Sequence, residues 1–185
     1  MEQLIKTNSD VVSRSACNEE SVPNESFVLR NANAYDLDAI LKVERETFEY
    51  PWARKEFEYC FNEKNCRGIL IERNGELVGY LFYEKRQRCY ALLNCAIVAS
   101  QRRRGLGTRL ARVLTKLLDA RRSEITCFAR ESNESAFLFL RSLGFREIWR
   151  ANRFYRATNE NAYKMTFQND TWEIERATYR RLNGK

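Results

Sequence analysis

The segment that most constrains this chain lies between residues 94 and 110, where an apolar run leads through a charged turn into an amphipathic stretch. The turn reads Arg-Arg-Arg-Gly-Leu-Gly-Thr from Arg102 to Thr108. The stretch after it has one apolar stripe at helical spacing, formed by Leu106, Leu110, Val113, Leu114, Leu117 and Leu118. This pattern predicts a buried strand, a tight turn and a helix that packs on a sheet.

Two glycines in the turn, Gly105 and Gly107, favour an anion-binding function. Glycine lets the backbone turn tightly and approach a ligand with no Cβ in the way. The free N–H groups at a helix start attract anions, and the adjacent arginines add positive charge. A pyrophosphate fits this description. The alternative is an ordinary strand-to-helix turn with exposed arginines. The turn is not a Walker loop, because the Gly-Lys-Ser/Thr ending of that motif is absent. It is not the GxGxxG dinucleotide-binding fingerprint either, because position 110 is Leu and not Gly.

The other periodicities predict an α/β chain with a mixed sheet and no doubly wound repeat. Asn74-Gly75 is a strong hairpin signal, Asp36 is a plausible cap for the first helix, and Gly144 ends the last one. Strands are expected at 27–29, 68–73, 77–84, 90–98, 125–129, 145–151 and 162–167, and helices at 37–48, 53–61, 105–118 and 133–143. One domain, residues 27–167, lies between a flexible tail (1–26) and a basic tail (168–185).

Composition excludes several kinds of chemistry. The 185 residues include six cysteines and no histidine, so Ser-His-Asp and Cys-His catalysis and His-containing zinc sites are ruled out. The cysteines are expected to be reduced thiols, and no metal site is expected. The first 26 residues lack the apolar region of a signal peptide, and the run from Ala91 to Ala99 is too short to span a bilayer. We expect a cytoplasmic protein whose net charge of +7 belongs mostly to a solvated surface.

A second segment links the turn to a known family. Asn133 opens a predicted helix that ends at Leu143-Gly144-Phe145. Together with the Q/R-x-x-G-x-G/A pattern at 102–107, it resembles the acetyl-CoA motifs of GNAT N-acetyltransferases. Tyr50-Pro51-Trp52 and Phe154-Tyr155 are similar to the substrate loops of the ribosomal-protein alanine N-terminal acetyltransferases. The resemblance covers residues 27–167.

This resemblance implies the GNAT acyl-CoA N-acyltransferase fold, a mixed and mostly antiparallel sheet flanked by helices, with acetyl-CoA as co-substrate. It implies that the backbone of residues 95–97 pairs with the pantetheine arm like an added strand, and that the Ile97 N–H polarises the thioester carbonyl. It also implies that the amides from Arg103 to Thr108 hold the pyrophosphate and that Asn133 contacts the cofactor. A helix N-cap is the alternative role of Asn133. The implied cofactor contacts are Cys95, Ala96, Ile97, Arg102, Arg103, Arg104, Gly105, Leu106, Gly107, Thr108 and Asn133.

The chain departs from the family at both catalytic positions. The register from Asn133 places Phe128 where the family commonly has a general-base Glu, and Leu140 where it has a general-acid Tyr. One such group contributes roughly 10² to 10⁴ in rate. Replacement candidates are Tyr155, Glu44 and Tyr90; Tyr155 is also expected to contact the acceptor, and Glu44 has the alternative role of a helix-edge residue paired to an arginine.

Four functions follow in order of preference. The first is acetyl transfer to a primary amine, preferably the α-amine of a protein N-terminus, because an enzyme without an acid or a base favours a weakly basic amine. The second is acetylation of a small amine such as a polyamine or an antibiotic. The third is an acetyl-CoA binder without turnover. Nucleic-acid binding comes last, because no recognised motif accompanies the positive charge.

Overall fold

The computed structural model describes residues 27–169 and residue 181. The strands in this part are β1 (Phe27–Asn31), β2 (Cys66–Arg73), β3 (Glu76–Lys85), β4 (Cys89–Ile97), β5 (Glu124–Arg130), β6 (Arg146–Tyr155) and β7 (Glu160–Gln168). The α-helices are α1 (Leu37–Thr47), α2 (Arg54–Asn62), α3 (Leu106–Thr115) and α4 (Glu134–Ser142), and short 3-10 helices cover Ala34–Asp36 and Ala99–Gln101.

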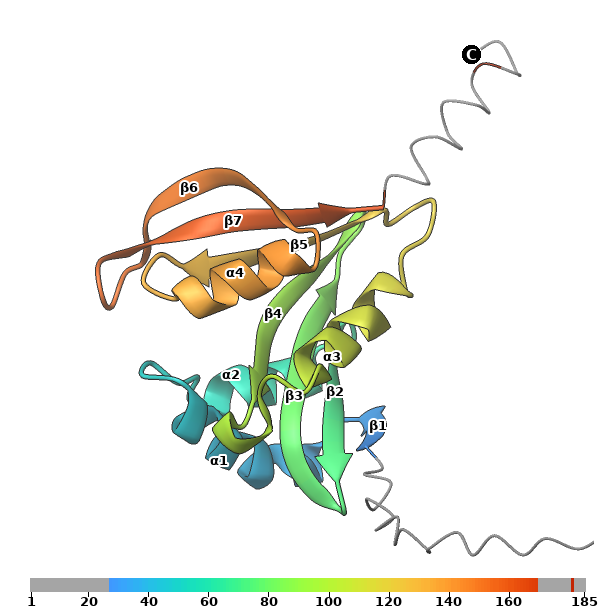
Figure 1. The fold of residues 1–185 in the computed structure, drawn as a ribbon, viewed down its shortest axis with the longest axis vertical. Coiled ribbons are helices and arrows are strands. Elements are labelled where there is room, and N and C mark those ends of the chain that lie inside the picture. Colours follow the sequence, from blue (N-terminus) through green and yellow to red (C-terminus); the bar gives the residue numbers. More distant parts are fainter. Residues whose placement is uncertain (1–26, 170–180, 182–185) are drawn as a thin grey trace, which may run out of the picture.

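All seven strands belong to one sheet, in the order β1-β2-β3-β4-β5-β7-β6. Every neighbouring pair is antiparallel except β4 and β5, which run parallel. The α/β class and the mixed, mostly antiparallel sheet are therefore confirmed. Figure 1 shows β5, β6 and β7 turning away from β2, β3 and β4, so the sheet opens between its two halves.

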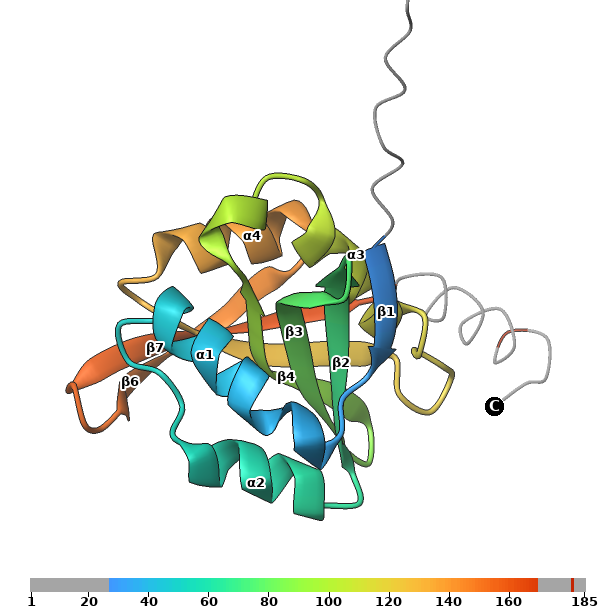
Figure 2. The same ribbon diagram turned by 90° about the horizontal axis from the view of Figure 1, so that it is seen from below.

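The central strands are covered on both faces. On one face, α1 and α2 pack against β2 and β3 through side chains such as Ile40, Phe57 and Tyr80. On the other, α3 and α4 contribute Leu110 and Leu140 to a second cluster. Figure 2 shows the two helix pairs on opposite sides of the sheet. A strand buried on both faces has a nearly continuous apolar run, which is why β3 lacks the alternation of a half-exposed strand.

Local signals placed most of the elements correctly. Asn74 and Gly75 both have positive φ, at 52° and 80°, as a two-residue hairpin between β2 and β3 requires. Gly144 has φ 93° directly after α4. No helix in the described part of the chain is long and apolar enough to cross a membrane. The two predicted tails lie outside the described residues, apart from Gln168, Asn169 and Arg181.

Three local expectations were wrong. Asp36 makes no cap hydrogen bond to α1; its carboxylate instead accepts two hydrogen bonds from Arg30, and Asn33 caps the preceding 3-10 helix. Helix α3 ends at Thr115, although Leu118 beyond it is still buried in the core. Strand β6 continues to Tyr155, because its hairpin with β7 resumes pairing at Tyr155 and Glu160 after an irregularity.

Candidate active site

The opening in the sheet is a slot between β4 and β5. Only three residue pairs join these strands, and the last of them is Ala91 with Thr126. Strand β4 then continues to Ile97 and β5 to Arg130 without pairing to each other. The edge of β4 beyond Ala91 therefore offers backbone groups to a ligand that enters the slot as an added strand.

The register of β4 decides which of its backbone groups face the slot. Val98 donates its N–H to the carbonyl of Val78, at 2.9 Å, on the β3 side. Backbone groups alternate between the two neighbours along a strand, so the groups of Ala96 also point toward β3, and those of Cys95 and Ile97 point into the slot. Arg102 confirms this direction for Ile97, because its Nε donates to the Ile97 carbonyl at 2.9 Å. The register favours Cys95 and Ile97 over Ala96 as backbone partners of a ligand.

The start of α3 has the geometry of an anion site. Its first helical bond runs from the Arg109 N–H to the Gly105 carbonyl at 2.9 Å, so the N–H groups of Leu106, Gly107 and Thr108 precede the helical ladder. Gly105 has φ 76°, and a Cβ placed on it would meet nothing within 4 Å. The approach to these amides is open at Gly105, and the arginines at 102–104 lie exposed beside it.

The two glycines of this turn are needed for different structural reasons. Gly105 has a left-handed backbone conformation that favours glycine. Gly107 instead lies against α4, where an added Cβ would come within 3.0 Å of the Phe139 ring. The absence of a side chain at Gly107 therefore lets α3 and α4 pack closely, which the sequence analysis did not predict.

Asn133 caps α4. Its side-chain oxygen accepts the Ala136 N–H at 3.0 Å, so the N-cap role is confirmed. Its predicted contact with the cofactor remains a prediction. The neighbouring Ser132 donates both its N–H and its hydroxyl to Glu160 of β7, which fixes the start of α4 to the sheet.

Glu44 lies inside the protein with only 1 % of its surface exposed. Its carboxylate accepts the Trp52 N–H at 2.7 Å and the Asn94 amide at 3.2 and 3.3 Å, and it also accepts the Tyr80 hydroxyl. Burial raises the pKa of this carboxyl, while the hydrogen bonds from Trp52 and Asn94 oppose the rise. No arginine pairs with it among the described residues. These bonds tie the loop after α1 to β3 and β4, and they occupy the oxygens that a general base would use.

The other two catalytic candidates lie at opposite ends of the slot. Tyr90 is 6 % exposed at the closed end, where its ring packs edge-on against Tyr83. Tyr155 lies on the open side, and its hydroxyl donates to the Phe128 carbonyl at 3.4 Å. Burial raises the pKa of Tyr155. Tyr155 therefore contacts β5 at Phe128, beyond the last pair that β5 forms with β4.

Arg130 is a site residue that the sequence analysis missed. Its guanidinium lies 3.8 Å from the centre of the Tyr155 ring and 4.8 Å from that of Tyr50, and it pairs with Glu160 at 2.6 Å. It therefore joins the loop after α1 to the β6–β7 hairpin across the mouth of the slot. A charged side chain at the end of the apolar strand β5 was the available signal.

Phe128 and Leu140, which occupy the positions where the family has catalytic groups, have different surroundings. Leu140 is 6 % exposed and belongs to the core between α4 and the sheet. Phe128 is half-buried and stacks on Phe154, with ring centres 4.2 Å apart and planes inclined by 15°. Phe128 therefore presents an aromatic surface beside the slot.

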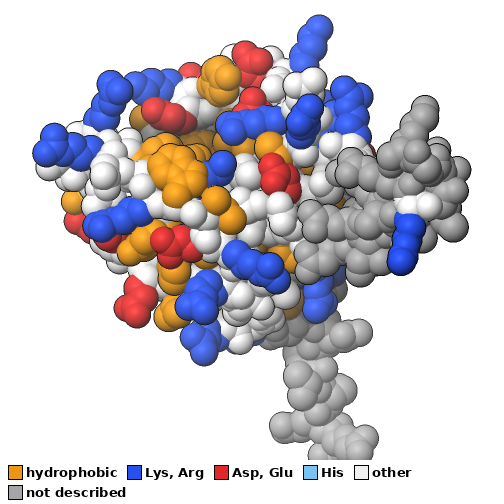
Figure 3. Space-filling model, turned by 90° about the horizontal axis from the view of Figure 1, so that it is seen from above, with side chains coloured by type: hydrophobic (Ala, Val, Ile, Leu, Met, Phe, Trp, Pro, Cys, Tyr) orange, Lys and Arg blue, Asp and Glu red, His pale blue; other side chains and the backbone are white. Residues whose placement is uncertain are grey.

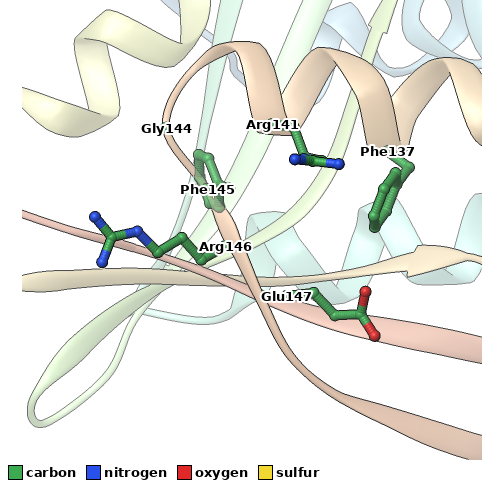
Figure 4. Close-up of a pocket in the computed structure, with 6 residues that line it drawn as sticks. All are labelled: Phe137, Arg141, Gly144, Phe145, Arg146 and Glu147. Carbon is green, nitrogen blue, oxygen red and sulfur yellow. The ribbon is translucent and has the colours of Figure 1, made fainter.

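A separate pocket lies between the second half of α4 and the start of β6 (Figure 4). It is lined by Phe137, Arg141, Gly144, Phe145, Arg146 and Glu147. None of the predicted site residues lines this pocket, so it is distinct from the slot.

Comparison with known proteins agrees with this geometry. Residues 37–145, more than half of the chain, match the model of the Acetyltransferase (GNAT) family. This chain belongs to the GNAT family. The GNAT fold expected from the two motifs is confirmed, and the chain is an acetyl-CoA-dependent N-acetyltransferase.

Individual GNAT relatives are distant in sequence. An N-alpha-acetyltransferase of Sulfurisphaera tokodaii is 28% identical over 160 residues, which are 79% of this chain and 95% of the relative. The ribosomal protein bS18-alanine N-acetyltransferase of Escherichia coli is 26% identical, over 67% of this chain and 84% of the relative. The crystal structure of an E. coli ribosomal-protein-alanine N-acetyltransferase has a TM-score of 0.70 and 23% identity, covering 77% of this chain and 94% of that one.

Proposed function

We propose that this GNAT protein transfers acetyl from acetyl-CoA to the α-amine of a protein N-terminus. The observation that carries the proposal is the slot at β4, which opens beside Tyr155 and Arg130 and has Phe128 in place of a catalytic carboxylate. The names of two relatives, an N-alpha-acetyltransferase and a ribosomal protein bS18-alanine N-acetyltransferase, support the same acceptor class. A cytoplasmic location is part of the proposal.

The cofactor-binding role rests on two groups of backbone atoms. The slot-facing groups of Cys95 and Ile97 suit the amides of the pantetheine arm, and the Ile97 N–H suits the thioester oxygen. The N–H groups of residues 106–108 suit the pyrophosphate, with the arginines at 102–104 adding positive charge. When bound, acetyl-CoA supplies an activated thioester. Burial raises the pKa of the Cys95 thiol to about 12, so this side chain stays protonated and is no nucleophile.

Without a general-base carboxylate and a general-acid phenol, the enzyme is expected to accept only amines that are already partly neutral. An α-amine has a pKa of about 7.7 to 8, so on the order of a tenth is neutral at pH 7, whereas fewer than about one in a thousand lysine amines are neutral. Positioning and polarisation of the thioester suffice for an amine that is already neutral. Phe128 and Leu140 cannot remove a proton from a lysine ammonium, so lysine is expected to be a poor acceptor.

Comparison of three acceptor classes tests this function. CoA release would be measured with a peptide carrying a free N-terminus, with the same peptide N-terminally blocked but containing lysine, and with a polyamine. We expect turnover with the first peptide and at most a hundredth of that rate with the second. Faster turnover of the polyamine would support the small-amine function instead. Binding of acetyl-CoA without turnover of any acceptor would indicate a non-catalytic binder and contradict the proposal.

A further inference from the structure

A continuous row of ring contacts leads from the loop after α1 to the edge strand β6. Arg130 lies between the rings of Tyr50 and Tyr155, and Tyr155 meets Phe154 edge-on at 5.1 Å. Phe154 stacks on Phe128 with ring centres 4.2 Å apart, and the row ends in an edge-on contact between Phe128 and Trp149, with ring centres 6.2 Å apart and planes inclined by 82°. The row starts at the mouth of the slot and runs outward along the sheet. We call Phe128, Phe154 and Trp149 the aromatic wall.

The aromatic wall is open to solvent although its side chains are large and apolar. Trp149 is 48 % and Phe154 is 44 % exposed. Figure 3, which views the molecule from the side of β6 and β7, shows apolar side chains gathered on this face among lysines, arginines and several acidic side chains. Exposed aromatic patches of this kind often mark binding sites. Because the row continues from Arg130 and Tyr155, an acceptor that reaches the slot passes beside it.

Lys164 on this face carries a positive charge that no carboxylate among residues 27–169 pairs with. Tyr163 and Met165 of β7 face the core with α4, so Lys164 between them faces the opposite side. Lys164 pairs in register with Phe128 on one side and with Trp149 on the other, so it lies in the same cross-strand row as the wall. Within residues 27–169 it has no ion-pair partner, whereas the guanidinium of Arg130 is paired with Glu160 and that of Arg150 with Glu131.

We infer that the aromatic wall binds a large apolar side chain in the first few residues of an acceptor protein, and that Lys164 pairs with a carboxylate beside that side chain. The inference rests on the proposed function and names the acceptor class within it: an N-terminal segment with neighbouring apolar and acidic residues. A basic segment is disfavoured, because its cations would meet the unpaired charge of Lys164.

Peptide acceptors test the inference directly. Ten-residue peptides with a common free N-terminal alanine would carry a guest phenylalanine or alanine at each of positions two to five, with aspartate or lysine beside the guest. CoA release gives kcat/KM for each peptide. At one guest position we expect phenylalanine to exceed alanine by about tenfold, as for burial of an aromatic group. Aspartate beside it should exceed lysine by about threefold or more.

Variants of the enzyme then assign the preference to the wall. Trp149→Ala and Phe154→Ala should each reduce the phenylalanine preference to about threefold or less, with unchanged KM for acetyl-CoA. The matched control is Tyr59→Ala, which removes another exposed aromatic side chain, 58 % exposed on α2; it should retain the full preference. Lys164→Glu should reverse the preference between aspartate and lysine, and Lys116→Glu, on the exposed end of α3, should not. Unfolding temperatures confirm that each variant is folded.

The outcomes separate the two levels of the proposal. Equal kcat/KM for phenylalanine and alanine at all four positions would overturn the aromatic wall and leave N-terminal acetylation standing. A phenylalanine preference that survives in both Trp149→Ala and Phe154→Ala would also overturn it. Failure to acetylate any peptide, while a polyamine is acetylated, would refute the proposed function and the wall together.

Discussion

Gly107 at the start of α3 and Phe139 of α4 are packed so closely that a Cβ on Gly107 would lie 3.0 Å from the Phe139 ring. The same glycine belongs to the turn whose amides are proposed to hold the cofactor's phosphates. Close packing of α3 on α4 therefore depends on the missing side chain of a residue in the amide turn itself. A bulky residue at this position is expected to disturb the fold and the cofactor site together.

Gly107→Ala should lower both stability and acetyl-CoA affinity. An extra methyl group in a packed contact costs about 1 to 3 kcal/mol, measured by urea unfolding. The double variant Gly107→Ala/Phe139→Leu should recover most of that stability, because leucine lacks the ring atoms that the Cβ approaches. Acetyl-CoA affinity, measured by calorimetry, should then return to within about threefold of the original. Full stability of the single variant would show that the Phe139 ring moves aside and that this packing does not require glycine.

Gly105→Ala should act through backbone strain alone, since no atom lies within 4 Å of its Cβ position. A left-handed conformation costs a residue with a Cβ about 1 kcal/mol or more, and Asn tolerates it better than Ala. We expect Gly105→Ala to lose about 1 kcal/mol of stability and Gly105→Asn less. Acetyl-CoA affinity should fall in the same order, because relaxation of the strain would move the amides that follow. Equal affinities for all three proteins would argue against a phosphate site at this turn.

Glu44→Gln should change how stability depends on pH. Burial raises the pKa of Glu44, so the folded state binds its proton more tightly than the unfolded state does. Its stabilising contribution is full below the unfolded pKa and falls as the pH rises through the folded-state pKa. The stability of the natural protein relative to Glu44→Gln should therefore decrease from pH 4.5 upward, in urea unfolding at several pH values. A difference that does not vary with pH would contradict the raised pKa.

The same variant should cost about 1 to 3 kcal/mol at pH 5. A glutamine side chain keeps one acceptor oxygen, but its NH₂ group cannot accept from Tyr80 or from the Asn94 amide. Glu58→Gln, a change at a half-exposed glutamate of α2, is the control and should stay within about 0.5 kcal/mol. If acetyl transfer falls in Glu44→Gln by far more than its loss of folded protein explains, Glu44 has a direct catalytic role after all.

Arg130→Lys should weaken acceptor binding without affecting the cofactor. Lysine keeps the charge beside Glu160 but lacks the planar group that lies between Tyr50 and Tyr155. We expect KM for an acceptor peptide to rise about three- to tenfold and KM for acetyl-CoA to stay the same. Arg150→Lys, at an arginine paired with Glu131 outside the ring row, should leave both constants unchanged. A rise in both KM values would indicate that Arg130 stabilises the sheet as a whole and does not act on acceptor binding alone.

Elements governed by near neighbours in the chain were predictable. The alternation and length of apolar runs placed the strands, and the Asn74-Gly75 turn placed the hairpin within a residue or two. The glycine turn before Leu106 follows from a left-handed backbone conformation at Gly105 that favours glycine. The Asn133 cap follows from a side-chain oxygen that accepts a backbone N–H at the start of the helix. The same local motifs were sufficient to indicate the family. Asp36 was misplaced because the competing partner, Arg30, is held on β1, where it also binds Glu72 of β2.

The sequence by itself determined which residues are apolar on each element and where the backbone must turn. Only the tertiary structure decided what those faces meet: Gly107 against Phe139, Glu44 among Trp52, Tyr80 and Asn94, and Phe128 in a stack with Phe154. Periodicity reports the face of an element but not its neighbour. The neighbour follows from the order of strands in the sheet and from the short parallel pairing of β4 with β5, which brings together residues tens of positions apart.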